Sequence, residues 1–393
     1  MKLTIRDPGF KKITAILSAS GEESRLVGGC VRDTLIGADP KDMDMATTAL
    51  PDDVQRLCLQ AGLRVVPTGL QHGTVTVVHD GVPYEVTTLR DDVETDGRHA
   101  RVQFVRDWKI DAARRDFTIN AMSIDDKGEL HDYFGGYDDL MAGRVRFVGT
   151  ATGRIQEDYL RILRYFRFRA RFGADVDGPT FTAVERNAEG LKRISVERIW
   201  SEVKKIIVHP EGYGQLLLMG ELGVLECIGF HEDERYLSGL RKIVPHTDKP
   251  GVALGSIVSS TAAIRHLAEN WKISNDELED ALATRRTIDD FEDFSSDYWV
   301  TKVVSGEEDG ERIAPALRAT GRGWIADILQ AGAPEFPVMG RDLIDLGMRP
   351  GPKLGQALAA LKDRWIDSGF SLTKVELLEG FADELDGGPK PWR

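Results

Sequence analysis

The feature that most constrains the fold is a change of hydrophobic period along the chain. Residues 73–80 (GTVTVVHD) and 82–90 (VPYEVTTLR) are rich in β-branched side chains and alternate in polarity, which is typical of strands. They meet at Asp80-Gly81, a pair that favours a hairpin turn. From about residue 154, apolar residues recur at helical spacing instead. The pattern predicts an α+β chain: an N-terminal part with a small mixed β-sheet and helices, then an all-α remainder. Helices are expected at 154–172, 179–190, 195–208, 213–222, 254–269, 275–284, 311–330, 354–367 and 373–384.

Composition excludes several classes of protein. No apolar run approaches the ~20 residues that a membrane span needs. The first residues, MKLTIRDPGFKKITAIL, lack a signal-peptide core, so we expect a cytoplasmic protein with no membrane partner. Cys30, Cys58 and Cys227 lie far apart, which argues against a disulfide framework and a paired-cysteine zinc site.

Charge is distributed unevenly along the chain. The formal net charge is -13, yet residues 141–210 carry 14 Lys and Arg against eight Asp and Glu. Within that stretch, EDYLRILRYFRFRARF (157–172) begins with two acids and then places an arginine at roughly every third residue. A basic segment in an acidic chain points to a local site for a phosphate-bearing ligand.

A first candidate site lies in LVGGCVRD (26–33). Gly28 and Gly29 follow a short predicted strand, and without a Cβ they let backbone N–H groups approach an anion closely. The next residues predict a short helix, and Arg32 on it adds a cation suited to phosphate. The segment matches neither the P-loop pattern nor the dinucleotide-binding glycine pattern.

A second candidate site is the pair Asp42 and Asp44 in KDMDM. On a strand, a spacing of two places both carboxylates on one face. Two adjacent carboxylates are costly unless a cation lies between them, and hard oxygen ligands suit Mg²⁺. Glu85 is our candidate for a third carboxylate, because its predicted strand is expected to neighbour that of the pair. A lone aspartate pair is most often a solvated turn and a lone glycine pair only a turn, but the two patterns together favour phosphate and metal chemistry.

With these segments the chain resembles the class II branch of tRNA CCA-adding enzymes and bacterial poly(A) polymerases, in the polymerase-β nucleotidyltransferase superfamily. GGCVRD and DMD resemble its catalytic signature, and further motifs follow in family order. These are RRDFTINAMSID (114–125), similar to the ribose-recognition motif; HDYFGGYDDLMAGRVRFVG (131–149), similar to the hinge segment; EDYLRILRYFRF (157–168), similar to the base-reading motif; and, more weakly, GRDLIDLGMRPGPKLGQAL (340–358).

The resemblance implies a fold, a reaction and a set of roles. It implies a catalytic head over residues 1–140, a helical neck over 141–210 that recognises the base, and an all-helical, tRNA-binding body and tail over 211–393. It implies template-independent addition of C, C and A to the 3′ end of tRNA from CTP and ATP, with release of pyrophosphate, and no protein partner is evident. By the same resemblance, a two-metal Mg²⁺ site is expected at Asp42 and Asp44, with Glu85 as the third catalytic carboxylate, and nucleotide binding is expected at Gly28, Gly29, Arg32, Arg115, Asp116, Asp158, Arg161, Arg164 and Arg167.

Placing residues 157–172 on one continuous helix separates two faces. Tyr159, Ile162, Leu163, Phe166 and Ala170 form a packing stripe, and Arg161, Arg164 and Arg167 lie opposite. Asp158 and Arg161, three residues apart, are expected to hold each other and to read the base: the carboxylate accepts from the exocyclic amine of C or A, and the guanidinium donates to a ring acceptor. The roles of Arg169, Arg171, Arg186, Lys192, Arg193, Arg198, Lys204 and Lys205 stay open between tRNA phosphate contact and surface charge.

Alternative functions remain within and beyond the family. A poly(A) polymerase shares the catalytic motifs, although HGTVTV (72–77) resembles the CCA branch. Residues 91–104 (DDVETDGRHARVQF) predict a flexible loop that resembles the one the family uses to switch from C to A addition; enzymes that add only CC tend to lack it, and an A-only enzyme stays possible. A catalytically dead RNA-binding relative is disfavoured because the motif residues occur together. His131-Asp132 lacks the other ligands of a phosphohydrolase and is expected to be structural.

Overall fold

The computed structural model describes residues 3, 7–40, 42–70, 73–95, 100–173, 178–290, 296–332, 334–368 and 370–379. Contacts divide the chain into two compact units, one of residues 1–206 and 214–231 and one of residues 207–213 and 232–393. The three-part division into head, neck and body stays a prediction.

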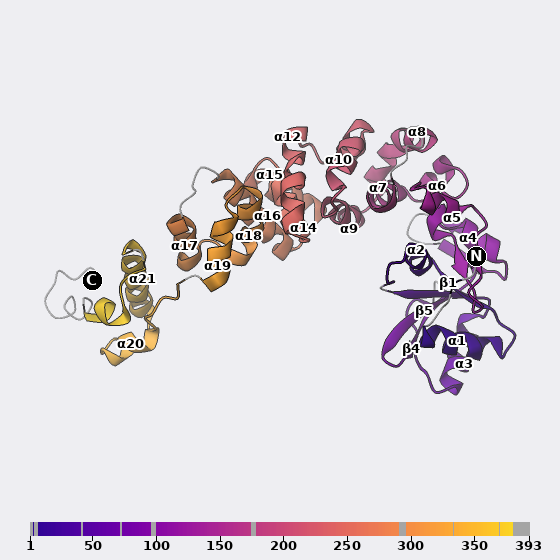
Figure 1. The fold of residues 1–393 in the computed structure, drawn as a ribbon, viewed down its shortest axis with the longest axis horizontal. Coiled ribbons are helices and arrows are strands. Elements are labelled where there is room, and N and C mark those ends of the chain that lie inside the picture. The colour runs from indigo at the N-terminus through magenta and orange to yellow at the C-terminus, as the bar shows by residue number, and fades with distance from the viewer. Residues whose placement is uncertain are drawn as a thin grey trace. The chain divides into compact units, whose positions relative to one another are not determined.

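The strands and helices follow the predicted order, strands first and then helices alone (Figure 1). The strands are β1 (Ser24–Val27), β2 (Met43–Thr47), β3 (Arg64–Val66), β4 (Thr74–His79), β5 (Val82–Thr88), β6 (Arg90–Thr95), β7 (Ala100–Phe104), β8 (Ser123–Ile124) and β9 (Leu130–His131). The helices of the first part are α1 (Pro8–Ser18), α2 (Gly29–Leu35), α3 (Pro51–Gln60), α4 (Trp108–Ala113), η2 (Thr118–Asn120), α5 (Gly136–Met141), α6 (Ala151–Glu157), α7 (Arg161–Phe172), α8 (Gly178–Asn187), η3 (Ala188–Arg193) and α9 (Val196–Ile207). The later helices are α10 (Gly212–Glu221), α11 (Val224–Cys227), α12 (Glu234–Leu237), α13 (Gly239–Ile243), η4 (Val244–His246), α14 (Pro250–Ile257), α15 (Thr261–Trp271), α16 (Asn275–Asp289), α17 (Ser296–Ser305), α18 (Gly310–Ala319), α19 (Gly323–Gly332), α20 (Gly340–Asp345) and α21 (Pro352–Asp367).

The first unit is built on a mixed sheet with strand order β3-β4-β5-β2-β1-β8-β9. Only β2 and β5 run parallel, and all other neighbours in this sheet are antiparallel. The predicted hairpin joins β4 and β5, where Asp80 (φ 50°) and Gly81 (φ 81°) both take the positive φ that the tightest hairpin turns require. The mixed sheet followed by helices confirms the predicted fold class.

One face of the sheet is covered by α1 and α3 (Figure 1). Phe10, Ile13 and Leu17 recur at helical spacing along α1 and are fully buried. Gly9 lets α1 approach β5, because a Cβ there would lie 2.2 Å from the Tyr84 ring. This packing holds β5 in place, and it thereby sets the position of Glu85 beside Asp44 on β2.

The prediction of a flexible loop at residues 91–104 is wrong for the part of this segment that the structure describes. β6 and β7 pair as an antiparallel two-stranded ribbon, with a register shift between Asp92 and Glu94. The ribbon is attached to the main sheet because Leu89 N–H donates to Thr47 O and Val105 N–H donates to Leu89 O. Polar composition had suggested a loop, but backbone pairing does not need apolar side chains. Residues 96–99, which connect β6 and β7 in the sequence, lie outside the described residues.

An aromatic cluster joins the segment around Phe117 and Phe147 to α7. Phe117 contacts Phe147 with ring centroids 4.7 Å apart and Phe168 with centroids 5.2 Å apart. Tyr165 lies 6.0 Å from Phe147 in a stacked arrangement. All four rings are buried. The cluster therefore positions α7 against the segment that begins at Arg114.

The described residues of the second unit form helices joined by loops, with no strand, as predicted, but two of the predicted helices are each divided in two. Residues 254–269 divide into α14 and α15, and Ser260 caps α15 by accepting from Ala263 N–H. Residues 311–330 divide into α18 and α19 at Gly321, whose φ is +81°. Across the described residues, no helix is both long and apolar enough to traverse a membrane.

Candidate active site

The glycine pair lies where β1 turns into α2. Gly28 has a φ of +70°, and a Cβ on it would lie 3.1 Å from an Arg115 guanidinium nitrogen and 3.8 Å from a carboxylate oxygen of Asp44. The site therefore needs glycine here for two reasons, the backbone conformation and the close approach of the two charged side chains. The turn also brings Arg32, on α2, toward the same region.

The predicted carboxylates gather at the parallel strand pair. Asp44 lies on β2 directly opposite Glu85 on β5, and exposed Asp42 lies just before β2. Burial, the charge of Glu85 and that of Asp42 raise the pKa of Asp44, although Arg115 opposes them. These carboxylates repel one another, so the donor set suits a hard cation such as Mg²⁺. Among the described residues, no three acidic, histidine or cysteine side chains already converge as a metal site, so Glu85 as a ligand stays a prediction.

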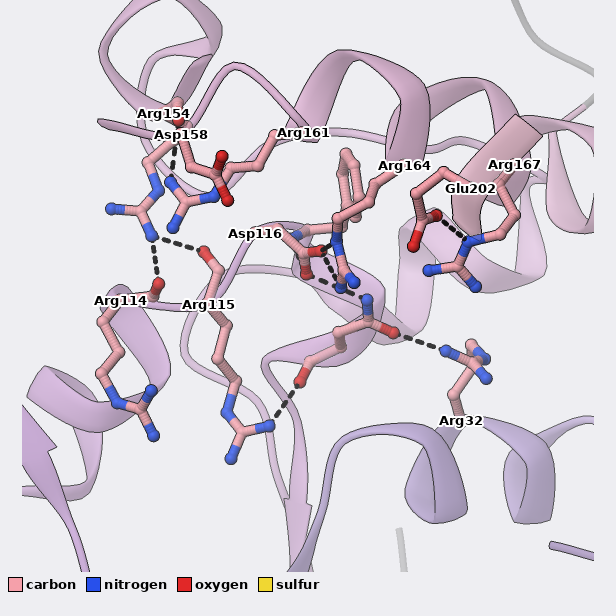
Figure 2. A network of polar contacts seen from close by, with 12 residues as sticks. Arg32, Arg114, Arg115, Asp116, Arg154, Asp158, Arg161, Arg164, Arg167 and Glu202 are labelled. Carbon is pink, nitrogen blue, oxygen red and sulfur yellow. Dashed lines mark hydrogen bonds and ion pairs between the residues drawn. The ribbon is translucent and has the colours of Figure 1, made fainter. Parts of the chain in front are cut away.

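Residues 114–125, the segment that resembles the ribose-recognition motif, form a hydrogen-bonded network between α2 and α7 (Figure 2). Arg32 donates from Nη1 to Asn120 Oδ1 at 2.6 Å, and Asn120 Nδ2 donates to Asp116 Oδ1 at 3.0 Å. Asp116 Oδ2 accepts from Arg164 Nε at 2.8 Å. Burial alone would raise the pKa of Asp116, but Arg164 and Asn120 outweigh it and hold that pKa below its usual value. Asp116 is therefore an anchor for Arg164 as well as a candidate ribose contact.

The base-reading segment differs from the predicted continuous helix. α6 ends at Glu157, Asp158 is extended (φ −154°, ψ 105°), and α7 begins at Arg161. The Asp158 carboxylate accepts from its neighbour Leu160 N–H at 3.2 Å, a local bond that competes with helical hydrogen bonding. The helical period could not show this interruption.

Consequently, the expected pairing of Asp158 with Arg161 was wrong. Arg161 Nη1 donates to Glu157 Oε2 at 2.6 Å and to Arg154 O at 2.8 Å. Asp158 Oδ2 accepts instead from Arg198 Nη2, on α9, at 2.7 Å. Each member of the candidate base-reading pair is thus oriented by its own partner.

The packing stripe of α7 is confirmed except for Tyr159, which precedes the helix and is only half-buried. Ile162, Leu163 and Phe166 are fully buried. Opposite them, Arg167 donates to Glu202 at 2.6 Å, so this arginine, like Arg164, has an acidic partner (Figure 2). Side chains that are already held by ion pairs lose less conformational entropy when a ligand binds.

These segments enclose a cavity of about 490 Å³ inside the first unit. Six arginines and three aspartates line it, a balance that suits a polyanion such as a triphosphate. Every predicted site residue except Asp42 and Glu85 belongs to its lining, which is Gly28, Gly29, Arg32, Asp44, Arg115, Asp116, Asn120, Asp158, Leu160, Arg161, Arg164, Arg167, Phe168 and Arg198.

A second cavity of about 360 Å³ adjoins the first. Gly29, Arg32 and Asp44 line both, and Asp42 lines only the second. Asp44 therefore lies at the boundary between the two cavities, and Asp42 lies on the side of the second. Glu85 belongs to neither lining.

Among the polar residues in or beside the cavity, Asn120, Arg154 and Arg198 were not assigned to the site from the sequence. Asn120 lies inside the quoted motif RRDFTINAMSID, so its place between two motif arginines could have been suspected. Arg154 binds the backbone carbonyls of Arg114 and Arg115 and the Glu157 carboxylate, and Arg198 binds Asp158 from α9. No sequence signal separates Arg154 or Arg198 from ordinary surface arginines.

Comparison with known proteins agrees with this geometry. A model of the poly(A) polymerase head domain matches residues 24–146, and one described as a probable RNA and SrmB-binding site of polymerase A matches residues 174–228. The zebrafish (Danio rerio) protein named CCA tRNA nucleotidyltransferase 1, mitochondrial, is 39% identical over 385 residues, which cover 94% of this chain and 89% of the relative. The chain belongs to the CCA-adding tRNA nucleotidyltransferase family.

Bacterial members of the family are similar over their whole length. The CCA-adding enzyme of Streptococcus sanguinis strain SK36 is 33% identical over 402 residues, which cover 98% of this chain and 100% of that enzyme. The crystal structure of the Bacillus stearothermophilus CCA-adding enzyme in complex with CTP superposes with a TM-score of 0.81 at 29% identity, covering 97% of this chain and 98% of that one. The family resemblance read from the sequence is thereby confirmed.

Proposed function

We propose that this chain adds C, C and A to the 3′ end of tRNA, using CTP and ATP and releasing pyrophosphate. The observation that carries the proposal is that one arginine-rich cavity gathers residues from the glycine turn, from the segment that resembles the ribose-recognition motif and from the base-reading segment. Full-length similarity to proteins named as CCA-adding enzymes, one of them solved with CTP, supports the same reaction.

In the proposed mechanism the cavity binds the nucleotide by charge and by hydrogen bonds to its base. Arg32, Arg115 and Arg164 provide cations for the triphosphate and ribose, and the network through Asn120 and Asp116 holds two of them in place. Preorganised donors of this kind stabilise developing charge without rearranging during the reaction.

The base is read by Asp158 and Arg161. Within the described residues, both bonds of Arg161 use Nη1, so Nε and Nη2 can donate to N3 of cytosine or N1 of adenine. Each oxygen of Asp158 accepts one bond, which leaves acceptor capacity for the exocyclic amine that C and A share. U and G present a carbonyl oxygen at that place and a protonated ring nitrogen beside it, so both contacts would fail.

Asp42 and Asp44 would hold the catalytic Mg²⁺, with Glu85 as a further carboxylate. The raised pKa of Asp44 supports this, because burial and the nearby charges of Glu85 and Asp42 disfavour its charged form, and a bound cation would offset both effects. When bound, Mg²⁺ supplies positive charge at the triphosphate and lowers the pKa of the attacking hydroxyl, and two such ions are expected. In the transfer the tRNA 3′ hydroxyl would release its proton to solvent, its oxygen would bond to the α-phosphorus, and the bond from that phosphorus to the pyrophosphate oxygen would break.

The partners of the reaction are therefore tRNA, ATP and CTP. We infer head, neck and body roles for residues 1–140, 141–210 and 211–393 from the family alone. The cytoplasmic location predicted from the sequence stays a proposal, because the zebrafish relative carries the word mitochondrial in its name.

An incorporation assay tests the proposal. A tRNA lacking its 3′-terminal CCA is incubated with Mg²⁺, CTP and ATP, with an Asp42→Ala/Asp44→Ala double variant as the blank. We expect three added nucleotides and then a stop. A long A tail would support a poly(A) polymerase instead, two added C residues or A addition alone would identify a partial enzyme, and no incorporation would refute the proposed activity.

A further inference from the structure

Arg198 occupies an unexpected place in the base-reading site. It lies on α9, forty residues after Asp158, and its Nη2 donates to Asp158 Oδ2 at 2.7 Å. Both side chains line the nucleotide cavity, with exposures of 27% for Arg198 and 18% for Asp158. A short, charge-assisted bond between two partly buried groups is stronger and better oriented than a surface ion pair.

The same helix also orients a second residue of the cavity, Arg167. Glu202, one turn after Arg198, is buried and binds Arg167 of α7 at 2.6 Å (Figure 2). α9 thus orients one acid and one arginine of the cavity through two separate ion pairs. These pairs differ in one respect: Arg198 binds the acid expected to read the base edge, whereas Glu202 binds an arginine further along α7.

We propose that Arg198 is a positioning residue that sets base selection by fixing the orientation of the Asp158 carboxylate. This inference rests on the proposed function, in which Asp158 reads the exocyclic amine. Arg198 holds Oδ2 and the Leu160 N–H holds Oδ1, so the carboxylate plane is set from both sides before a nucleotide enters. α7 itself supplies neither of these bonds.

A carboxylate held in one orientation discriminates between bases because it can accept a hydrogen bond but cannot donate one. It accepts from the amine of C or A, but it cannot donate to the carbonyl oxygen of U or G. Sites built around such a hydrogen bond reject the wrong ligand strongly, because the mismatched polar groups remain unpaired. Without Arg198 the carboxylate can rotate, and U and G are then rejected less strongly.

The experiment measures kcat/KM for single additions of C, A, U and G to defined tRNA ends, using full-length wild type, Arg198→Met and Arg198→Lys. Glu202→Gln is the matched control, because it weakens the other ion pair of the same helix. We expect Arg198→Met to lower the C-over-U and A-over-G ratios about tenfold or more, the factor for losing one hydrogen bond to a charged group. Arg198→Lys should restore part of the ratios, and Glu202→Gln should leave them at wild-type values.

Three results would overturn the inference. Unchanged ratios in Arg198→Met, with all four nucleotides slowed equally, would make Arg198 a structural residue only. A lower KM for CTP in Arg198→Met, with ratios unchanged from wild type, would mean that Arg198 competes with the nucleotide for the Asp158 carboxylate. An equal loss of selection in Glu202→Gln would assign the effect to α9 packing. Because wild type is measured first, failure of CCA addition itself would be seen separately.

Discussion

Replacing Asp116 by Asn tests the hydrogen-bonded network that joins residues 114–125 to α7. The substitution keeps the volume but removes the charge that faces Arg164. Breaking a buried ion pair by removing one partner costs ~3–5 kcal/mol. Since the Arg164 side chain is 33% exposed, water solvates part of the charge left behind, and we expect a loss of about 2–3 kcal/mol in the free energy of unfolding of the first unit at pH 7.

Native-state hydrogen exchange of α7 peptides at increasing urea measures this loss separately from the stability of residues 232–393. The matched control is Asp53→Asn, the same chemical change in the Asp53–Arg56 pair, whose side chains are 46% and 54% exposed; it should cost less than ~1 kcal/mol.

The difference in the free energy of unfolding between wild type and Asp116→Asn should depend on pH in a definite direction. The folded pKa of Asp116 lies below its unfolded value of about 3.9. Its contribution to stability is therefore fully present above that unfolded pKa and is lost as the pH falls through the folded pKa. The difference between wild type and Asp116→Asn should be constant between about pH 5 and pH 8 and should shrink in stronger acid. A loss no larger than that of Asp53→Asn, or one that persists in acid, would refute the reasoning.

Three further substitutions address the catalytic and base-reading residues. Asp44→Asn should reduce incorporation to the blank while leaving the free energy of unfolding unchanged or higher, because it removes the repulsion from Glu85; added Mg²⁺ should raise the Tm of wild type more than that of the variant, and equal shifts would argue against metal binding at this site. Gly28→Ala should lower kcat/KM for both CTP and ATP and cost about 1 kcal/mol or more of stability, since it combines a φ of +70° with a 3.1 Å approach to Arg115; a variant as active as wild type would contradict the need for glycine. Exchanging Asp158 and Arg161 should move preference toward UTP and GTP in single-addition assays, and an unaltered preference would show that these residues do not read the base.

Features set by local sequence could be predicted. The Asp80-Gly81 turn fixed the hairpin, and the spacing of β-branched residues gave β4 and β5. From these, Glu85 was correctly expected on a strand beside that of Asp44. The stripe of Ile162, Leu163 and Phe166 followed from helical period alone.

Features that depend on competing hydrogen bonds, or on partners distant in the sequence, could not be predicted. The Asp158 carboxylate captures a nearby backbone N–H and interrupts a pattern that is helical on both sides. Arg198 reaches Asp158 across 40 residues, and only the packing of α9 beside α7 brings them together. The β6–β7 ribbon is likewise stabilised by backbone pairing that a polar sequence does not reveal.

Stepwise addition to defined tRNA ends tests the central claim most directly. Purified protein with Mg²⁺ is given tRNA lacking CCA together with CTP alone, ATP alone, or both, and products are resolved at single-nucleotide length. The account predicts two added nucleotides with CTP alone, none with ATP alone, and three with both, after which extension stops. Extension by ATP alone into a long tail, or equal use of UTP and GTP, would contradict it.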